Sequence, residues 1–170
     1  TVKFGHITYY FNGNSYDIPA GEVEEEVPSY KEPFNTRPWM KSAEITDKLI
    51  AAIESGKYDF LRVNYPGGDM VGHFGELEPT IIAMEAIDVC LKRIVDAVNK
   101  LGGITIITAD HGNAEELIDE KGNAKTSHTT NKIPFALVDE TDNRKLYALK
   151  KGEFGLANVA STVAGLLGVE

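Results

Sequence analysis

Apolar residues recur every three or four positions in three stretches of the chain, which is the period of a helix that buries one face. The stretches span residues 42–54, 78–101 and 158–167, and glycines just beyond them are expected to end the helices. Residues 78–101 form the longest predicted helix. Its apolar face is expected to comprise Ile81, Met84, Ala86, Ile87, Leu91, Ile94, Val95 and Val98.

Four shorter stretches have the composition of strands. Residues 4–11 and 59–65 are rich in β-branched and aromatic side chains, residues 104–108 are almost all apolar, and residues 133–138 form a further apolar run. Turn-forming Asn, Gly and Pro residues follow the first two stretches. Residues 15–40 have no steady period and contain four of the seven prolines, so we expect a long surface loop there.

The alternation of predicted strands and helices indicates an α/β fold with a mostly parallel sheet. In such a sheet, binding sites form beyond the carboxyl ends of the strands. Asp69 follows the strand predicted at residues 59–65, and Asp110 follows the strand predicted at residues 104–108. We therefore expect both aspartates at the same edge of the sheet.

The composition is that of a globular domain, since 42% of the 170 residues are hydrophobic and 25% are charged. The formal net charge of -9 argues against nucleic-acid binding, which needs clustered Lys and Arg. No apolar run approaches the ~18–20 residues that span a bilayer, so we expect no membrane association. Cys90 is the only cysteine and is expected to be buried; the lack of an intrachain disulfide is typical of a cytoplasmic protein.

Three of the four histidines lie in predicted loop segments together with two aspartates. Asp69 and His73 would share one face if a helix begins after the Gly-Gly turn, because they are four residues apart. Asp110 and His111 are adjacent and suit two roles, or a second ion, better than chelation of one ion. His128 lies in a polar loop that could bring a further ligand. Clustered His and Asp side chains indicate a divalent metal site of the kind used for phosphoryl transfer.

Each of these features has a simpler interpretation when it is taken alone. A single histidine is usually a surface residue, and the Asp-His-Gly-Asn segment at residues 110–113 could be only a turn. The joint occurrence is harder to explain in that way, because two of the three histidine segments follow predicted strands in a chain with few histidines. A metal site is therefore the favoured interpretation.

Three segments narrow the interpretation further: residues 64–73 (NYPGGDMVGH), 108–115 (TADHGNAE) and 126–131 (TSHTTN). In this order and spacing they closely resemble the cofactor-independent (2,3-bisphosphoglycerate-independent) phosphoglycerate mutases, which belong to the alkaline phosphatase superfamily. The resemblance extends from Lys3 almost to the end of the chain. It implies a three-layer α/β fold with helices on both faces of a mostly parallel sheet, of which this chain would form a part.

The same resemblance implies two divalent metal ions, Mn²⁺ or Mg²⁺. The ligands of the first ion correspond to Asp69, His73 and His128. Ligands of the second ion correspond to Asp110 and His111. Lys3 corresponds to a lysine that contacts the transferred phosphoryl group. The implied reaction interconverts 3-phosphoglycerate and 2-phosphoglycerate through a phosphoserine, in glycolysis and gluconeogenesis.

The chain also departs from the family pattern. None of its six serines corresponds to the nucleophile, and no segment corresponds to the inserted domain that holds the glycerate. The chain begins with Thr rather than Met, and residues 1–170 are expected to be the carboxyl-terminal part of the phosphatase-like domain. By itself it is expected to be inactive and to self-associate through an exposed sheet edge. The alternatives are another phosphomutase or phosphatase of the superfamily, or a non-catalytic metal-binding fragment.

Overall fold

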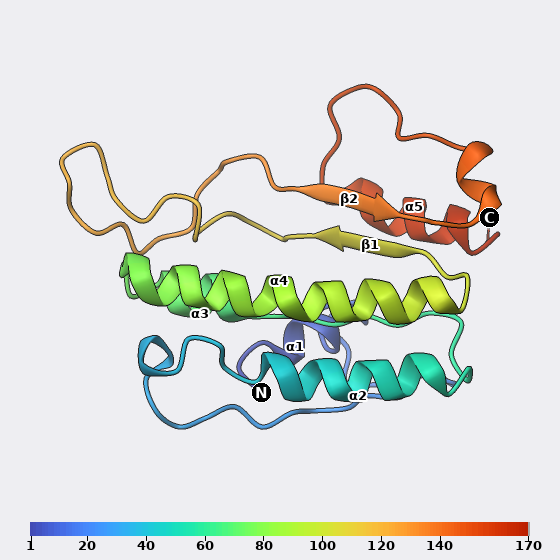
Figure 1. Cartoon of the computed structure of the whole chain (residues 1–170), viewed down its shortest axis with the longest axis horizontal. Coiled ribbons are helices and arrows are strands. Elements are labelled where there is room, and N and C mark those ends of the chain that lie inside the picture. The colour runs from blue at the N-terminus through green and yellow to red at the C-terminus, as the bar shows by residue number, and fades with distance from the viewer. Residues whose placement is uncertain (170) are drawn as a thin grey trace.

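The long helix α4 (Leu77–Lys100) is the centre of the structure, a computed structural model that describes residues 1–169. In Figure 1, α4 runs between α2 (Ser42–Glu54) on one side and the strands β1 (Thr105–Thr108) and β2 (Phe135–Val138) on the other. The short helix α3 (Gly67–Gly72) packs against α4. The remaining elements are α1 (Phe4–Ile7), the 3₁₀ turns η1 (Phe34–Thr36) and η2 (Asp142–Lys145), and α5 (Ala157–Leu166).

The three helices predicted from apolar periodicity are confirmed, each within one residue of its expected bounds. The predicted apolar face of α4 is partly wrong, because Ile81 and Met84 are 46% and 44% exposed. The buried stripe instead consists of Thr80, Ala83, Ile87, Cys90, Ile94 and Ala97. This stripe repeats at alternating steps of three and four, and contact with α2 and α3 selects it over the neighbouring stripe. Cys90 is buried, as expected.

Two apolar clusters hold the helices together. Ile53 of α2 packs with Ile94 and Ala97 of α4, and Tyr65 lies against this cluster. The second cluster joins Val71 of α3 to Ala83 of α4 and to Met40. Val71 is fully buried, so α3 has one fixed position against the long helix. This packing matters because α3 carries Asp69.

The sheet differs from the prediction. Strands are confirmed at β1 and β2, but they pair antiparallel, with Thr105 opposite Val138 and Thr108 opposite Phe135. Within residues 1–169 this pair is the whole sheet, so the predicted three-layer arrangement with a mostly parallel sheet is not confirmed. Thr105, Ile106 and Ile107 of β1 are partly buried and Thr108 is exposed, so this strand is not covered on both faces.

The strand predicted at residues 4–11 is wrong. Residues Phe4–Ile7 form α1, and turns follow in which the backbone N–H of Tyr10 donates to the carbonyl of Gly5 at 2.9 Å. The hydroxyl of Thr8 donates to the carbonyl of Phe4 at 2.9 Å. Strand preference depends on a partner strand, and without one these local hydrogen bonds satisfy the backbone.

The strand predicted at residues 59–65 does not form a ladder either. The segment has no backbone–backbone hydrogen bond to any other part of residues 1–169. Its clearest tie is a side-chain bond, in which Nε of Arg62 donates to the carbonyl of Ile7 at 2.6 Å. Residues 15–40 contain no regular element except η1, as predicted. None of the helices in the described part of the chain has the length and apolar character required to cross a membrane.

Candidate metal centre

Helix α3 places the first two candidate ligands. It begins at Gly67, so the two glycines form its first residues instead of a turn before it. Its first turn is closed by the N–H of Met70, which donates to the carbonyl of Pro66 at 2.8 Å. Gly67 lies against α4, where an added Cβ would come within 3.3 Å of Ile87 Cδ1. The helix ends at His73, so Asp69 and His73 project from the same face one turn apart.

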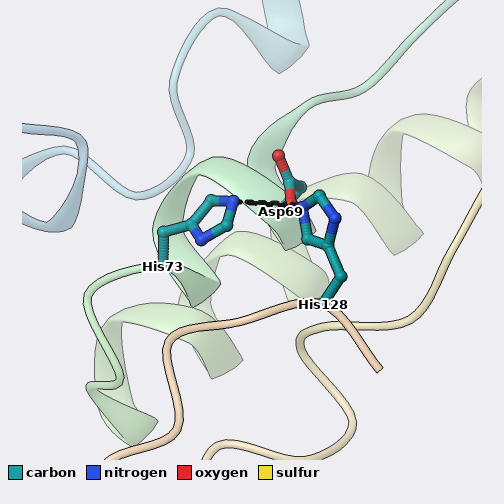
Figure 2. A group of neighbouring side chains, drawn as sticks. All are labelled: Asp69, His73 and His128. Atoms are coloured by element: carbon teal, nitrogen blue, oxygen red, sulfur yellow. Dashed lines mark hydrogen bonds and ion pairs between the residues drawn. The ribbon is translucent and has the colours of Figure 1, made fainter. Parts of the chain in front are cut away.

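Asp69, His73 and His128 converge on one point, although His128 is 55 residues from His73. Figure 2 shows the two imidazole rings on either side of the Asp69 carboxylate. Asp69 Oδ1 lies 3.0 Å from His73 Nε2 and 2.9 Å from His128 Nε2. The two Nε2 atoms are 3.2 Å apart. Three potential ligand atoms therefore lie within one small space.

This arrangement fits a divalent metal ion. Ligand bonds of about 2.1 Å at right angles place neighbouring ligand atoms about 3 Å apart. The spacings of 2.9 to 3.2 Å within the cluster match that value. Imidazole nitrogen together with carboxylate oxygen is a donor set that first-row divalent ions accept. Both histidines are exposed at their outer side, which leaves room for further ligands from solvent or substrate.

A hydrogen bond to the backbone fixes the orientation of the His73 ring. Its Nδ1 lies 2.6 Å from the carbonyl oxygen of Thr126, which can only accept, so Nδ1 carries the hydrogen. The lone pair of Nε2 is then directed toward Asp69 and His128. A backbone carbonyl on the far nitrogen is the usual way in which a metal-binding histidine is oriented. The bond also ties α3 to the loop that carries His128.

Asp69 is held on both oxygens. Lys3 Nζ forms an ion pair with Oδ2 at 2.8 Å, and the Asn113 amide donates to Oδ1 at 3.1 Å. Burial would raise the pKa of Asp69, but these two contacts outweigh it and lower the pKa to about 2. Lys3 is itself only 16% exposed. Its ammonium therefore lies beside the cluster rather than in bulk solvent.

His111 contacts the cluster directly, whereas Asp110 contacts His111. The His111 ring stacks on His128 with centroids 3.7 Å apart, and its Nε2 is 4.0 Å from Asp69 Oδ1. The Asp110 side chain is 58% exposed, and its Oδ2 lies 3.6 Å from His111 Nε2. Neither residue belongs to the three-ligand cluster found among residues 1–169. The adjacent pair thus lies at the rim of the cluster, and its separate role stays a prediction.

Two residues of the site were not assigned from the sequence. Asn113 is buried and contacts Asp69, and its Oδ1 is buried with no hydrogen-bond partner among the described residues. Glu115 accepts hydrogen bonds from Asn113 and Asn131, which lie in two separate parts of the connection between β1 and β2. Both lie in the TADHGNAE segment, close to the candidate ligands Asp110 and His111. That proximity is the only signal in the sequence, because Asn and Glu are common in loops.

Comparison with known proteins shows the family of the chain. The family model described as the metalloenzyme superfamily matches residues 1–170. A 2,3-bisphosphoglycerate-independent phosphoglycerate mutase of Pseudoalteromonas atlantica is 45% identical over 100% of this chain, which covers 32% of that protein. The enzyme of the same name from Trypanosoma brucei brucei is 43% identical over 100% of this chain and 34% of its own length.

A solved structure is also similar. The phosphoglycerate mutase of Leishmania mexicana, crystallised at low cobalt concentration, superposes with a TM-score of 0.85 at 40% identity. The match covers 99% of this chain and 34% of that one. The likeness supports an alkaline-phosphatase-like α/β fold of which this chain forms a part. The chain spans about a third of the length of the relatives it matches.

Proposed function

We propose, because the chain belongs to the metalloenzyme superfamily, that it forms the metal-binding part of a phosphoglycerate mutase. The observation that carries the proposal is the convergence of Asp69, His73 and His128 in a chain that matches enzymes of that name along its whole length. The proposed reaction interconverts 3-phosphoglycerate and 2-phosphoglycerate through a phosphoserine. Its proposed setting is glycolysis and gluconeogenesis in the cytoplasm.

Two divalent ions, Mn²⁺ or Mg²⁺, are the proposed cofactors. Asp69, His73 and His128 would hold one ion, and Asp110 and His111 would contribute to a second. When bound, such ions supply positive charge that neutralises phosphoryl oxygens and favours ionisation of an attacking hydroxyl. The first set has three ligand atoms within 3.2 Å of a neighbour. The second pair needs further ligands, which we place in the part of the enzyme that this chain does not match.

Lys3 is proposed to contact the transferred phosphoryl group. Its ammonium is held 2.8 Å from Asp69 Oδ2 and is mostly buried, so a positive charge is already present beside the cluster. A lysine ammonium acts on phosphate as a point charge with three donors. A phosphoryl oxygen arriving at the rim of the site would meet this group without a large movement of the chain.

The nucleophilic serine and the groups that hold the glycerate are proposed to lie outside residues 1–170. This placement is supported by the share of the relatives that the chain covers, which is 32% and 34% for two of them. Residues 1–170 would then be the carboxyl-terminal part of the phosphatase-like domain. By themselves they are expected to show no mutase turnover.

The decisive test is mutase activity in the full-length protein. His73→Ala should lower kcat/KM by at least ~100-fold, because it removes one of three ligands. His6→Ala is the matched control, since His6 contacts Tyr10 and lies outside the cluster. Full activity in His73→Ala would contradict the proposal. Hydrolysis of phosphate esters without isomerisation would support a superfamily phosphatase instead.

Self-association of the 170-residue chain is a further proposal. Within residues 1–169 the segment 59–65 forms no backbone–backbone hydrogen bond, and the side chains of Tyr58, Phe60 and Leu61, in or next to it, are exposed. The same segment and α2 line a cavity of about 470 Å³. Unpaired extended backbone next to apolar surface favours strand addition by a second copy. Light scattering after gel filtration should show a dimer that Leu61→Lys weakens; a wild-type monomer at all concentrations would contradict this.

A further inference from the structure

The carboxylate of Glu115 joins two parts of the connection between β1 and β2, residues 112–116 and residues 127–131. Its Oε2 accepts a hydrogen bond from the backbone N–H of Asn113 at 2.6 Å, on the loop that follows β1. Its Oε1 accepts from the hydroxyl of Thr129 and from the amide of Asn131 at 3.0 Å, both on the loop that carries His128. One side chain therefore bonds three donors on two separate segments.

Two of the hydrogen-bond partners of Glu115 contact or adjoin the proposed ligands. Asn113 donates from its amide to Asp69 Oδ1 at 3.1 Å. Thr129 is the residue after His128, and its backbone N–H donates to the carbonyl of Gly112 at 2.9 Å. Since Asp69 and His128 lie on segments far apart in the sequence, their spacing depends on this connection between the loops.

The connection is closely packed. A Cβ added at Gly112 would overlap Glu115 Oε1 and Thr129 Oγ1, so only glycine leaves room for the hydrogen bond between them. A Cβ added at Gly72 would come within 2.6 Å of Asn113 Oδ1. The two glycines allow Glu115 and Asn113 to approach the backbone of the neighbouring segments.

The donors around Glu115 require a carboxylate. All three partners present an N–H or O–H group, and a carboxylate offers only acceptors. Glutamine would place an NH₂ group against one of those donors. No Lys or Arg among residues 1–169 forms an ion pair with Glu115, whereas its neighbour Glu116 pairs with Lys125 at 2.6 Å. Glu115 is thus suited to holding neutral donors in place.

We propose that Glu115 is a positioning residue that sets the separation of His128 from Asp69 and thereby the geometry of the metal centre. It acts through Asn113 on Asp69 and through Thr129 on His128. The proposal rests on the proposed function, because it assumes that the cluster binds a divalent ion. Outer-shell partners of this kind typically change metal affinity ~10–100-fold when they are replaced.

The test is a Co²⁺ titration of the 170-residue chain, followed by calorimetry and by visible absorption. Glu115→Gln should weaken Co²⁺ binding ~10-fold or more and change the absorption bands. Thr129→Val removes the same hydrogen bond from the other side and should act in the same direction. The two changes should be non-additive in the double variant, because they break one shared interaction. Glu120→Gln is the charge-matched control in the same loop, since the described residues give its carboxylate no partner.

Urea unfolding of the metal-free chain distinguishes a positioning role of Glu115 from a role in folding stability alone. Glu115 lies outside both apolar clusters, so Glu115→Gln should lower the urea midpoint only slightly and leave the chain fully folded without urea, where Co²⁺ binding is measured. Unchanged Co²⁺ affinity and absorption in Glu115→Gln would overturn the proposal. If that variant does not fold, unchanged binding in Thr129→Val overturns it instead. A wild-type chain that binds no Co²⁺ would contradict the proposed function itself.

Discussion

Asp69 has the largest number of polar contacts in the candidate site. Both histidines approach its Oδ1, where the Asn113 amide also donates, and Lys3 pairs with its Oδ2. Burial opposes the charged form, but the cation and the amide keep the pKa at about 2. The carboxylate is therefore charged at neutral pH and attracts cations. Strongly shifted pKa values are more frequent at functional sites than elsewhere in proteins.

Gly72 tests how tightly the site is packed. Gly72→Ala should destabilise the chain by about 1–3 kcal/mol, because the new Cβ would come within 2.6 Å of the buried Asn113 amide. It should also weaken metal binding by displacing Asn113 from Asp69. Urea unfolding and a Co²⁺ titration measure the two effects. Gly165→Ala is the control: nothing lies within 4 Å of it in α5, and it should not destabilise the chain.

Tyr65 makes stability depend on pH at the alkaline end. Burial raises its pKa to about 12, although its bond to Thr46 opposes the rise. Because the folded pKa exceeds the unfolded value of about 10, the contribution is fully present below pH ~10 and is lost as the pH rises toward ~12. Tyr65→Phe should remove this loss. At neutral pH the variant should be about 1 kcal/mol less stable, since the 2.6 Å bond to Thr46 is gone.

Urea midpoints measured at neutral pH and near pH ~11 test this dependence. The difference between the wild type and Tyr65→Phe isolates Tyr65 from other tyrosines. Tyr16→Phe is the control, because that side chain is exposed. Equal alkaline losses in the wild type and Tyr65→Phe would show that Tyr65 ionises as freely in the folded chain as in the unfolded one.

At the scale of the elements, the three longer helices and two of the four strands were predictable from the sequence. Each of α2, α4 and α5 makes its own hydrogen bonds and shows its period in its own sequence. Residues 4–11 and 59–65 have strand composition, yet a strand needs a partner for every backbone group. Neither stretch finds one within residues 1–169, so one forms turns and the other stays extended.

The contact between α2 and α4 is expected to supply much of the stability. Ile94→Ala should cost about 2–5 kcal/mol, because Ile94 is buried against Ile53 and Ala97 and its removal leaves a cavity. Val89→Ala on the exposed side of α4 should change stability by less than ~0.5 kcal/mol. Urea unfolding of both variants measures the difference. Equal effects would mean that the described cluster is not the core of the chain.

At the scale of the whole molecule, the proposed metal would link distant segments. His73 ends α3, whereas His128 lies in the loop between β1 and β2. A ligand that binds only the folded state stabilises it, by about 2.7 kcal/mol at a concentration of 100 times Kd. Saturating Mn²⁺ should therefore raise Tm, and a chelator should reverse the rise.

Thermal unfolding of two histidine variants tests that link. In His128→Ala the rise in Tm with Mn²⁺ should largely disappear, because one of the three ligand atoms is missing. In His6→Ala the rise should persist, since His6 is outside the cluster. An equal rise in both variants would place the bound ion elsewhere on the molecule.

The sequence by itself determined the three longer helices, α2, α4 and α5, and the residue types of the site. The period of a helix can be seen within its own stretch of sequence. The candidate ligands Asp69, His73 and His128 stand out because the chain has only four histidines. Only the tertiary structure decided that His128 meets Asp69 at 2.9 Å while Asp110 remains exposed. It also showed Asn113 and Glu115 holding the loops. Such contacts depend on how separate segments pack, and no periodicity within one segment encodes that.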